Sequence, residues 1–255
     1  MQKLEFNTWA QLQQWLEQYK DGQKQFVFRG QADSEWPLQT SLARHFVDNH
    51  VNEHEWRKRE LKMYRNFREN LLETYRGLHK RWIPLDVLSL MQHYHAPTRL
   101  LDFTYDPKVA AFFALEDSRG ESAIWVVDKK RLEQRRRKKG LLDYCGPVHN
   151  PRYNVFQKDE EGKYRLVGSI LDPKQKNDRL AAQQGCFLVP GSISKYISDD
   201  LVHAKVRLSS KLVVESLNNL EKQGYNCKRL FPNLMKMAKE AKRFSVIGDA
   251  CCSCG

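Results

Sequence analysis

One apolar segment, VAAFFAL at residues 109–115, constrains the fold of this chain more than any other feature. Its residues are apolar around the whole circumference of a helix, so a helix that they form must be buried on every side. Asp106 and Pro107 precede the segment as a helix N-cap and a first-turn proline. The sequence therefore predicts a core that surrounds this helix.

Residues 98–104, TRLLDFT, are predicted to form a short strand that leads into the buried helix. Pro97 favours extended backbone at the residue before it. The strand places Arg99 and Asp102 among leucines, where an unpaired charge would cost several kcal/mol. We therefore expect Arg99 to pair with Asp102 or with close neighbours, and to be required for folding.

Other segments also have the periodicity of regular structure, and Thr8 and Gln11 form a capping box at the first of them. The order of these segments favours an α+β fold, with one domain built on a mixed or antiparallel sheet core and surrounding helices. Helices are expected at 8–20, 53–74, 209–220 and 231–244, and strands at 25–29, 123–127, 186–189 and 201–208.

The chain is strongly basic, with 43 Lys and Arg against 31 Asp and Glu and a net charge of +12. Such a surface favours polyanionic partners, either nucleic acid or phosphate-bearing ligands. The run Lys129–Lys139 concentrates the charge, since eight of its eleven residues are cationic. We predict that this run binds nucleic acid or another polyanion and contributes nothing to folding; the alternative is a solvated helix or loop.

No targeting or membrane segment is expected from the sequence. The first residues, MQKLEFNTWA, lack a basic region followed by an apolar run, and no apolar stretch approaches the length of a membrane span. The six cysteines are expected to be reduced thiols of a cytoplasmic protein, and residues 246–255 a flexible Cys-containing tail.

Several spaced motifs resemble the FRG domain family, which is named for a Phe-Arg-Gly tripeptide. The chain has Phe28-Arg29-Gly30 at the end of a predicted strand and QHYHAPTRLLDFT at residues 92–104, before the buried helix. QQGCF follows at residues 183–187 and LFPNL at 230–234. The resemblance extends over residues 1–245, with 129–165 as a basic, loop-like insertion.

The motifs also resemble, more distantly, the ADP-ribosyltransferase fold, in which an Arg at the end of a strand holds a phosphate of NAD. The resemblance implies that NAD is the substrate, that the nicotinamide–ribose bond is cleaved, and that no metal is needed. The acceptor of the ADP-ribosyl group is left open. The implied NAD-binding residues are Arg29, Gly30, Gln92, Thr98 and Thr104, and the implied catalytic residues are His93, Asp102, Gln183 and Gln184.

Arg29, His93, Thr104 and Gln183 or Gln184 are expected to line one cleft. Gly30 is expected to let the backbone approach the ligand closely. This chain has glutamines where the resembling enzymes have a glutamate, and Asp102-Phe103-Thr104 in place of their Ser-Thr-Ser. An alternative is therefore a module of the same shape that binds a nucleotide or nucleic acid without turnover. A metal-dependent hydrolase ranks third. Such an enzyme needs clustered carboxylates, and Asp102, Asp106 and Glu116 do not form a cluster in the sequence.

Overall fold

The computed structural model describes residues 1–19, 25–74, 82–138, 156, 168–173, 178–190, 193, 197 and 201–231, with only the backbone for 135–138. The strands are β1 (Gln2–Phe6), β2 (Phe26–Gln31), β3 (Leu101–Thr104), β4 (Ser122–Asp128), β5 (Ser169–Leu171), β6 (Gly185–Val189) and β7 (Ala204–Leu208). The helices are α1 (Trp9–Glu17), α2 (Ser41–Asp48), α3 (Glu53–Thr74), α4 (Pro84–His93), α5 (Pro107–Leu115), α6 (Lys129–Lys138), α7 (Asp178–Ala182), η3 (Ser210–Leu212), α8 (Val213–Lys222) and α9 (Cys227–Leu230).

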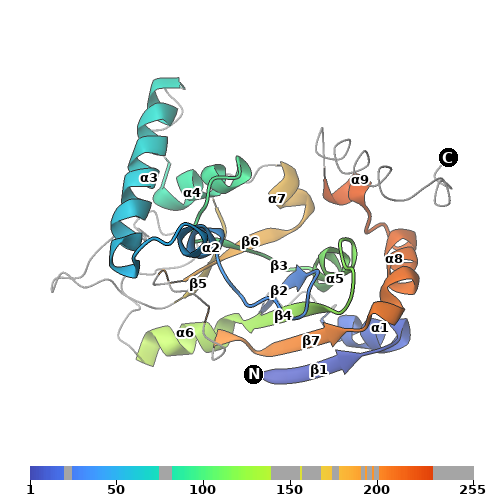
Figure 1. Ribbon diagram of the computed structural model, residues 1–255. Helices are drawn as coiled ribbons and strands as arrows, with labels where there is room; N and C mark the ends of the chain where they lie inside the picture. The colour runs from blue at the N-terminus through green and yellow to red at the C-terminus, as the bar shows by residue number, and fades with distance from the viewer. Residues whose placement is uncertain are drawn as a thin grey trace.

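The strands of the described residues form a seven-stranded sheet in the order β1-β7-β4-β2-β3-β6-β5. β1 runs parallel to β7, and the other neighbouring pairs are antiparallel. The fold is therefore mixed α/β, and the predicted mixed sheet with surrounding helices is confirmed (Figure 1).

The helix boundaries agree best with the prediction where the sequence contains a clear capping signal. Thr8 and Gln11 form the predicted capping box, and the Asp106 side chain accepts a hydrogen bond from Lys108 N at 2.9 Å. Helix α3 has the predicted bounds, and α5 is buried among α1, α8 and the sheet. Strand β1 and helices α2 and α4 were not predicted, although Leu4 and Phe6 alternate with polar residues in β1 and Thr40 caps the amphipathic helix α2.

Two groups of helices cover the same face of the sheet. Helices α1, α5 and α8 pack on one half of this face, around Phe28 of β2 and its neighbours in β4 and β7. Helices α4 and α7 pack on the other half, against Phe187 and Val189 of β6 (Figure 1). Asp102 pairs with Phe187 and Thr104 pairs with Phe28, so both polar residues of β3 face this side, where the two groups meet.

Gly30 lies on the α5 side of β2 and is needed for packing. A Cβ atom at this position would lie 2.0 Å from Ala110 O and 2.5 Å from Ala114 N, both atoms of the α5 backbone. The expectation that the Gly30 backbone approaches a ligand stays a prediction, since Gly30 also lines a cavity, and the contact with α5 is an additional packing role. The space beside Gly30 is filled by α5, which the missing side chain lets approach β2.

Gly30→Ala is expected to lower the free energy of unfolding by roughly 3 kcal/mol or more, because backbone atoms cannot move aside as a side-chain tip can. Gly120→Ala is the matched control, since a Cβ there meets no atom within 4 Å. Urea denaturation of the two variants measures the difference. Equal midpoints for both variants would contradict this account of Gly30.

The basic run contributes to the core through its first turn. Leu132 of α6 is buried with Val27 and Phe103 on the opposite face of the sheet. Lys129 Nζ donates to the Tyr105 hydroxyl at 3.2 Å. The prediction that Lys129–Lys139 contributes nothing to folding is therefore wrong, because the Leu132 side chain is part of the core.

Arg99 is fully buried, and its charge is paired with Glu60 of α3. Arg99 Nε and one terminal nitrogen donate to the two carboxylate oxygens of Glu60. Of the two predicted alternatives, pairing of Arg99 with Asp102 is wrong, and Arg99 pairs instead with a carboxylate that is near in space. Residues three apart in extended backbone point to opposite sides, so the side chains of Arg99 and Asp102 diverge. Strand β3 itself begins only at Leu101.

Three predictions lie outside the described residues: the loop-like insertion beyond residue 139, the helix from 232 to 244, and the tail at 246–255. Cys186 and Cys227 are buried and form no disulfide. Among the residues that are described, no helix has both the length and the apolar character to cross a membrane.

Candidate functional site

Two adjoining cavities lie where the two helix groups meet. The apolar cavity has a volume of about 630 Å³ and is lined by Phe28, Trp36, Pro37, Val109, Ala110 and Phe113, among others. The polar cavity, of about 270 Å³, is lined by Ser41, Ser89, Gln92, His93 and His95, among others. Both cavities are bordered by Arg29, Gln39, Arg44, Asp102, Arg179 and Gln183. The larger volume is within the usual range for small-molecule sites, about 300–1,000 Å³.

Arg29 reaches both cavities because β2 and β3 share only the pair Phe28–Thr104. β2 continues its ladder with β4 as far as Gln31, so its β3-facing edge is unpaired at Arg29. One Arg29 Nη donates to Asp102 O at 2.9 Å. Because side chains alternate along a strand, Arg29 of β2 starts on the face opposite Thr104. Beyond the single pair Phe28–Thr104 the two strands are not joined, and the Arg29 side chain reaches the cavities there.

Three arginines, from three different elements, border both cavities: Arg29 of β2, Arg44 of α2 and Arg179 of α7. Burial lowers the pKa of the Arg29 guanidinium, the Asp102 carboxylate raises it, and Arg44 lowers it. The guanidinium nevertheless stays charged at neutral pH. Arg29 Nε is buried and has no hydrogen-bond partner in the described part of the chain. This cluster is suited to an anionic ligand, and the guanidinium fork matches phosphate oxygens.

The Asp102 carboxylate is held by a short chain of side-chain hydrogen bonds. Leu100 N donates to Thr98 Oγ1 at 3.2 Å, so the Thr98 hydroxyl proton is available for Gln92 Oε1, to which it donates. This contact orients the Gln92 amide, whose Nε2 donates to Asp102 Oδ1 at 2.8 Å. Asp102 Oδ2 accepts no hydrogen bond from the described residues, although the carboxylate interacts electrostatically with Arg29. Thr98 borders neither cavity, and with Gln92 it positions the carboxylate.

The structure separates the two candidate glutamines. Gln183 Nε2 donates to Leu230 O at 2.9 Å, which fixes the amide because a carbonyl only accepts. Its Oε1 is an acceptor that is unpartnered within the described ranges. Gln184 has a φ of 46° and borders neither cavity. Its Nε2 points instead to Asp106 Oδ2, at 3.4 Å.

The predicted single cleft is divided between the two cavities. Arg29 and Gln183 border both, His93 borders the polar cavity, and Thr104 borders the apolar one. The Thr104 hydroxyl donates to Gln183 O at 2.7 Å and accepts from Asp106 N at 3.0 Å. Thr104 therefore anchors the backbone of Gln183, and its hydroxyl is already used in doing so.

Sequence reasoning missed Arg44, Arg179 and Trp36. Arg179 had a usable signal, since it lies four residues before Gln183, and residues at this spacing share a helix face. Gln183 N indeed bonds to Arg179 O at 3.0 Å. Arg44 had no such signal, because a cationic residue on the exposed side of a short helix is common. The described residues contain no group of three His, Cys, Asp or Glu that could hold a metal ion.

Comparison with known proteins supports the resemblance to the FRG domain. A family model described as FRG domain matches residues 24–123, which include the Phe-Arg-Gly tripeptide and the QHYHAPTRLLDFT motif. Residues 24–123 are therefore similar to the FRG domain. Arg29, Arg44 and Asp102 lie within the matched residues, while Arg179 and Gln183 follow them in the chain and complete the cavities. No curated protein and no solved structure matched the chain. The similarity to ADP-ribosyltransferases stays a prediction.

Proposed function

We propose that the two cavities bind NAD and that the protein cleaves its nicotinamide–ribose bond, as an ADP-ribosyltransferase or an NAD glycohydrolase. The observation that carries the proposal is the set of groups that border both cavities. Arg29, Arg44 and Arg179 supply cationic donors there, and Asp102 supplies a carboxylate with one oxygen that accepts no hydrogen bond from the described residues. The arginines match the phosphates of such a ligand, and the carboxylate matches an adjoining electron-poor centre, as the ribose C1′ of NAD is during cleavage.

Arg29 is the principal phosphate ligand in this proposal. Its Nε is buried with no partner in the described structure, and a phosphate oxygen satisfies such a donor at little extra cost in desolvation. Arg44 adds a second guanidinium whose side chain makes no hydrogen bond or ion pair within the described residues. Two forked cations facing one site favour a diphosphate over a single carboxylate.

Asp102 supplies the negative charge that the reaction needs. Cleavage of the C1′–N bond leaves the electron pair on nicotinamide and positive charge on the ribose, which a nearby carboxylate stabilises. Arg99 does not neutralise Asp102, since Glu60 holds that arginine. Gln183 Oε1 is placed to accept a hydrogen bond from a ribose hydroxyl. The acceptor then adds to C1′ and loses its proton, or water does so and gives ADP-ribose.

A second candidate, binding without turnover, is favoured by one specific feature. Gln183 has a neutral amide where the resembling enzymes have a glutamate, and an amide stabilises a developing cation less than a carboxylate does. In this alternative the arginines hold the phosphates as proposed, and Asp102 serves only to position Arg29.

The test is incubation of the purified protein with NAD labelled in the nicotinamide ring. We expect release of labelled nicotinamide, together with binding of NAD measured by calorimetry. Binding without release would favour the second candidate. Absence of binding at millimolar NAD would overturn both, because each requires the arginine cluster to hold the diphosphate.

A further inference from the structure

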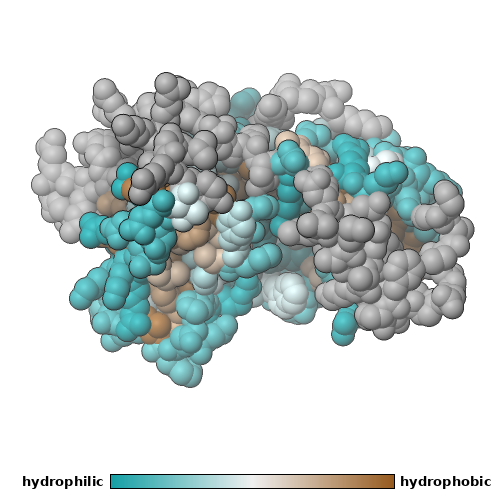
Figure 2. All heavy atoms as spheres, turned by 90° about the horizontal axis from the view of Figure 1, so that it is seen from above, coloured by the Kyte–Doolittle hydropathy of each residue, from teal (hydrophilic) through white to brown (hydrophobic). Residues whose placement is uncertain are grey.

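Trp36 is unusual among the tryptophans, because its side chain is exposed. Its relative exposure is 53%, whereas Trp9, Trp15, Trp56 and Trp125 are buried. In the view of Figure 2 the described surface is mostly hydrophilic, with apolar atoms in small patches. Trp36 also lines the apolar cavity, beside Pro37 and Phe113. An exposed indole at the edge of a cavity offers a flat apolar surface to a ligand.

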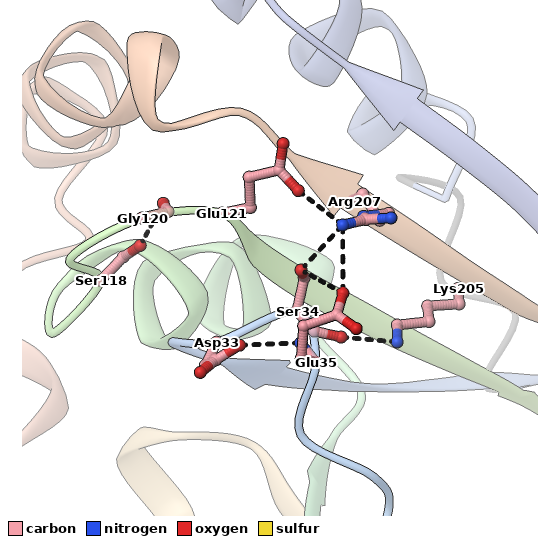
Figure 3. A network of polar contacts seen from close by, with 8 residues as sticks. All are labelled: Asp33, Ser34, Glu35, Ser118, Gly120, Glu121, Lys205 and Arg207. Atoms are coloured by element: carbon pink, nitrogen blue, oxygen red, sulfur yellow. Dashed lines mark hydrogen bonds and ion pairs between the residues drawn. The ribbon is translucent and has the colours of Figure 1, made fainter.

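The backbone before Trp36 is held in place by a network of polar contacts (Figure 3). Ser34 N donates to Glu121 O at 2.8 Å, and Lys205 Nζ donates to Ser34 O at 2.6 Å. Arg207 contacts both Glu35 and Glu121, at 3.1 and 2.6 Å. These partners lie on β7 or directly before β4, so this part of the loop is attached to the sheet.

The backbone after Trp36 is held as well. Gln31 Nε2 donates to Pro37 O at 3.4 Å, and Ile197 N donates to Leu38 O at 2.8 Å. The indole is therefore exposed on a fixed loop. A fixed aromatic ring binds a planar partner with little loss of conformational entropy, which is the advantage of a preorganised site.

The order of the two cavities matches the order of groups in a nucleotide. The apolar cavity lies on one side of Asp102 and Gln183, and the polar cavity with His93 and His95 lies on the other. A ring, a ribose and a phosphate in sequence would place the ribose at Asp102, where the proposed chemistry needs it. The ring then occupies the apolar cavity, and the phosphates extend towards the polar one.

We infer that Trp36 stacks on the nicotinamide ring of NAD in the apolar cavity; this inference rests on the proposed function. The nicotinamide ring of NAD carries a positive charge, and the indole face attracts cations more strongly than other aromatic side chains do. Asp117, which lines this cavity and not the polar one, adds a carboxylate on the same side.

Stacking of this kind acts mainly on the bound substrate. When the C1′–N bond breaks, the nicotinamide ring becomes neutral and loses the cation–π attraction, which favours its release. Trp36 therefore stabilises the ground state more than the transition state. Its removal is expected to raise KM for NAD and to leave kcat nearly unchanged.

The experiment compares Trp36→Ala and Trp36→Phe with the parent protein by calorimetry, using two ligands. One ligand is a carbocyclic NAD analogue, which keeps the charged ring and cannot be hydrolysed; the other is ADP-ribose, which lacks the ring. Trp36→Ala is expected to weaken the analogue roughly 5- to 100-fold and to leave ADP-ribose unchanged. Trp36→Phe is expected to weaken the analogue less.

Tyr94→Ala is the matched control, since Tyr94 is an aromatic residue of 64% exposure that lines neither cavity. Equal affinity of the parent and Trp36→Ala for the analogue, with nicotinamide release intact in the parent, would overturn the stacking and leave the proposed function standing. An equal loss for both ligands would place adenine on Trp36 and overturn the assignment. A parent protein that binds neither ligand would overturn the proposed function and this inference together.

Discussion

Arg99→Ala is expected to lower the free energy of unfolding by roughly 3–5 kcal/mol, because it leaves the Glu60 carboxylate buried without its charge partner. The side chains of Arg99 and Glu60 are only 1% and 3% exposed, so water cannot replace the lost contact. The guanidinium also lies 5.6 Å from the ring centroid of Phe156, and its removal opens space there. The midpoint of urea denaturation measures the effect.

Arg59→Ala on α3 is the matched control for this pair. Arg59 bonds to Glu55 at 2.7 Å, one turn away, but these side chains are 53% and 47% exposed. An exposed pair at this spacing contributes at most about 0.5 kcal/mol. Each variant removes an arginine from a glutamate of α3, so their comparison separates burial from charge pairing as the cause of the loss.

The double variant Arg99→Met with Glu60→Leu is expected to recover most of the stability that Arg99→Ala loses. Apolar residues of similar volume need no hydrogen bonds, so no buried charge is left unpaired. A double variant as unstable as Arg99→Ala would show that packing dominates at this site. An Arg99→Ala variant that melts like the parent would contradict the buried pair itself.

The ion pair illustrates why sequence reasoning predicted some elements and not others. Helix α3 follows from apolar residues at helical spacing, and α5 follows from its Asp106 N-cap and its continuous apolar run; all of these are local signals. The partner of Arg99 lies on α3, thirty-nine positions earlier in the chain, and no local pattern points to it. The leucines around Arg99 indicated that this arginine is buried and needs a carboxylate partner. The packing of α3 against this segment determines that the partner is Glu60.

In the candidate site, too, some residues were indicated by the sequence and others could be identified only from the fold. Arg29 and Asp102 stood out because polar residues interrupt apolar strands, and both border the cavities. Gln183 and Gln184 were equivalent in the sequence, and only the turn at the end of α7 decides which of them borders the cavities. Gly30 was expected to let a ligand approach the backbone, and the structure adds a close approach of α5 that the sequence did not indicate. Sequence indicated which residues were unusual, and the fold determined what each contacts.

Asp102→Asn is expected to lower kcat for nicotinamide release by about 10²–10³-fold, the usual cost of removing one preorganised electrostatic group from a reacting centre. Asparagine keeps the size of the side chain and an oxygen for Gln92 Nε2, so the chain of bonds from Thr98 is preserved. Affinity for NAD is expected to change little, since the arginines hold the diphosphate. Single-turnover release of labelled nicotinamide and calorimetry with the carbocyclic analogue measure the two effects.

Asp117→Asn is the control for charge, because Asp117 lines only the apolar cavity and is expected to affect binding more than turnover. The comparison tests where positive charge develops in the reaction. A carboxylate beside C1′ gains importance as the bond breaks, whereas one beside the nicotinamide ring loses it when the ring becomes neutral. Equal losses of kcat in both variants would mean that net charge in the cavity, and not the position of Asp102, governs turnover. Unchanged kcat in Asp102→Asn would remove Asp102 from the chemistry and leave it the single role of holding Arg29.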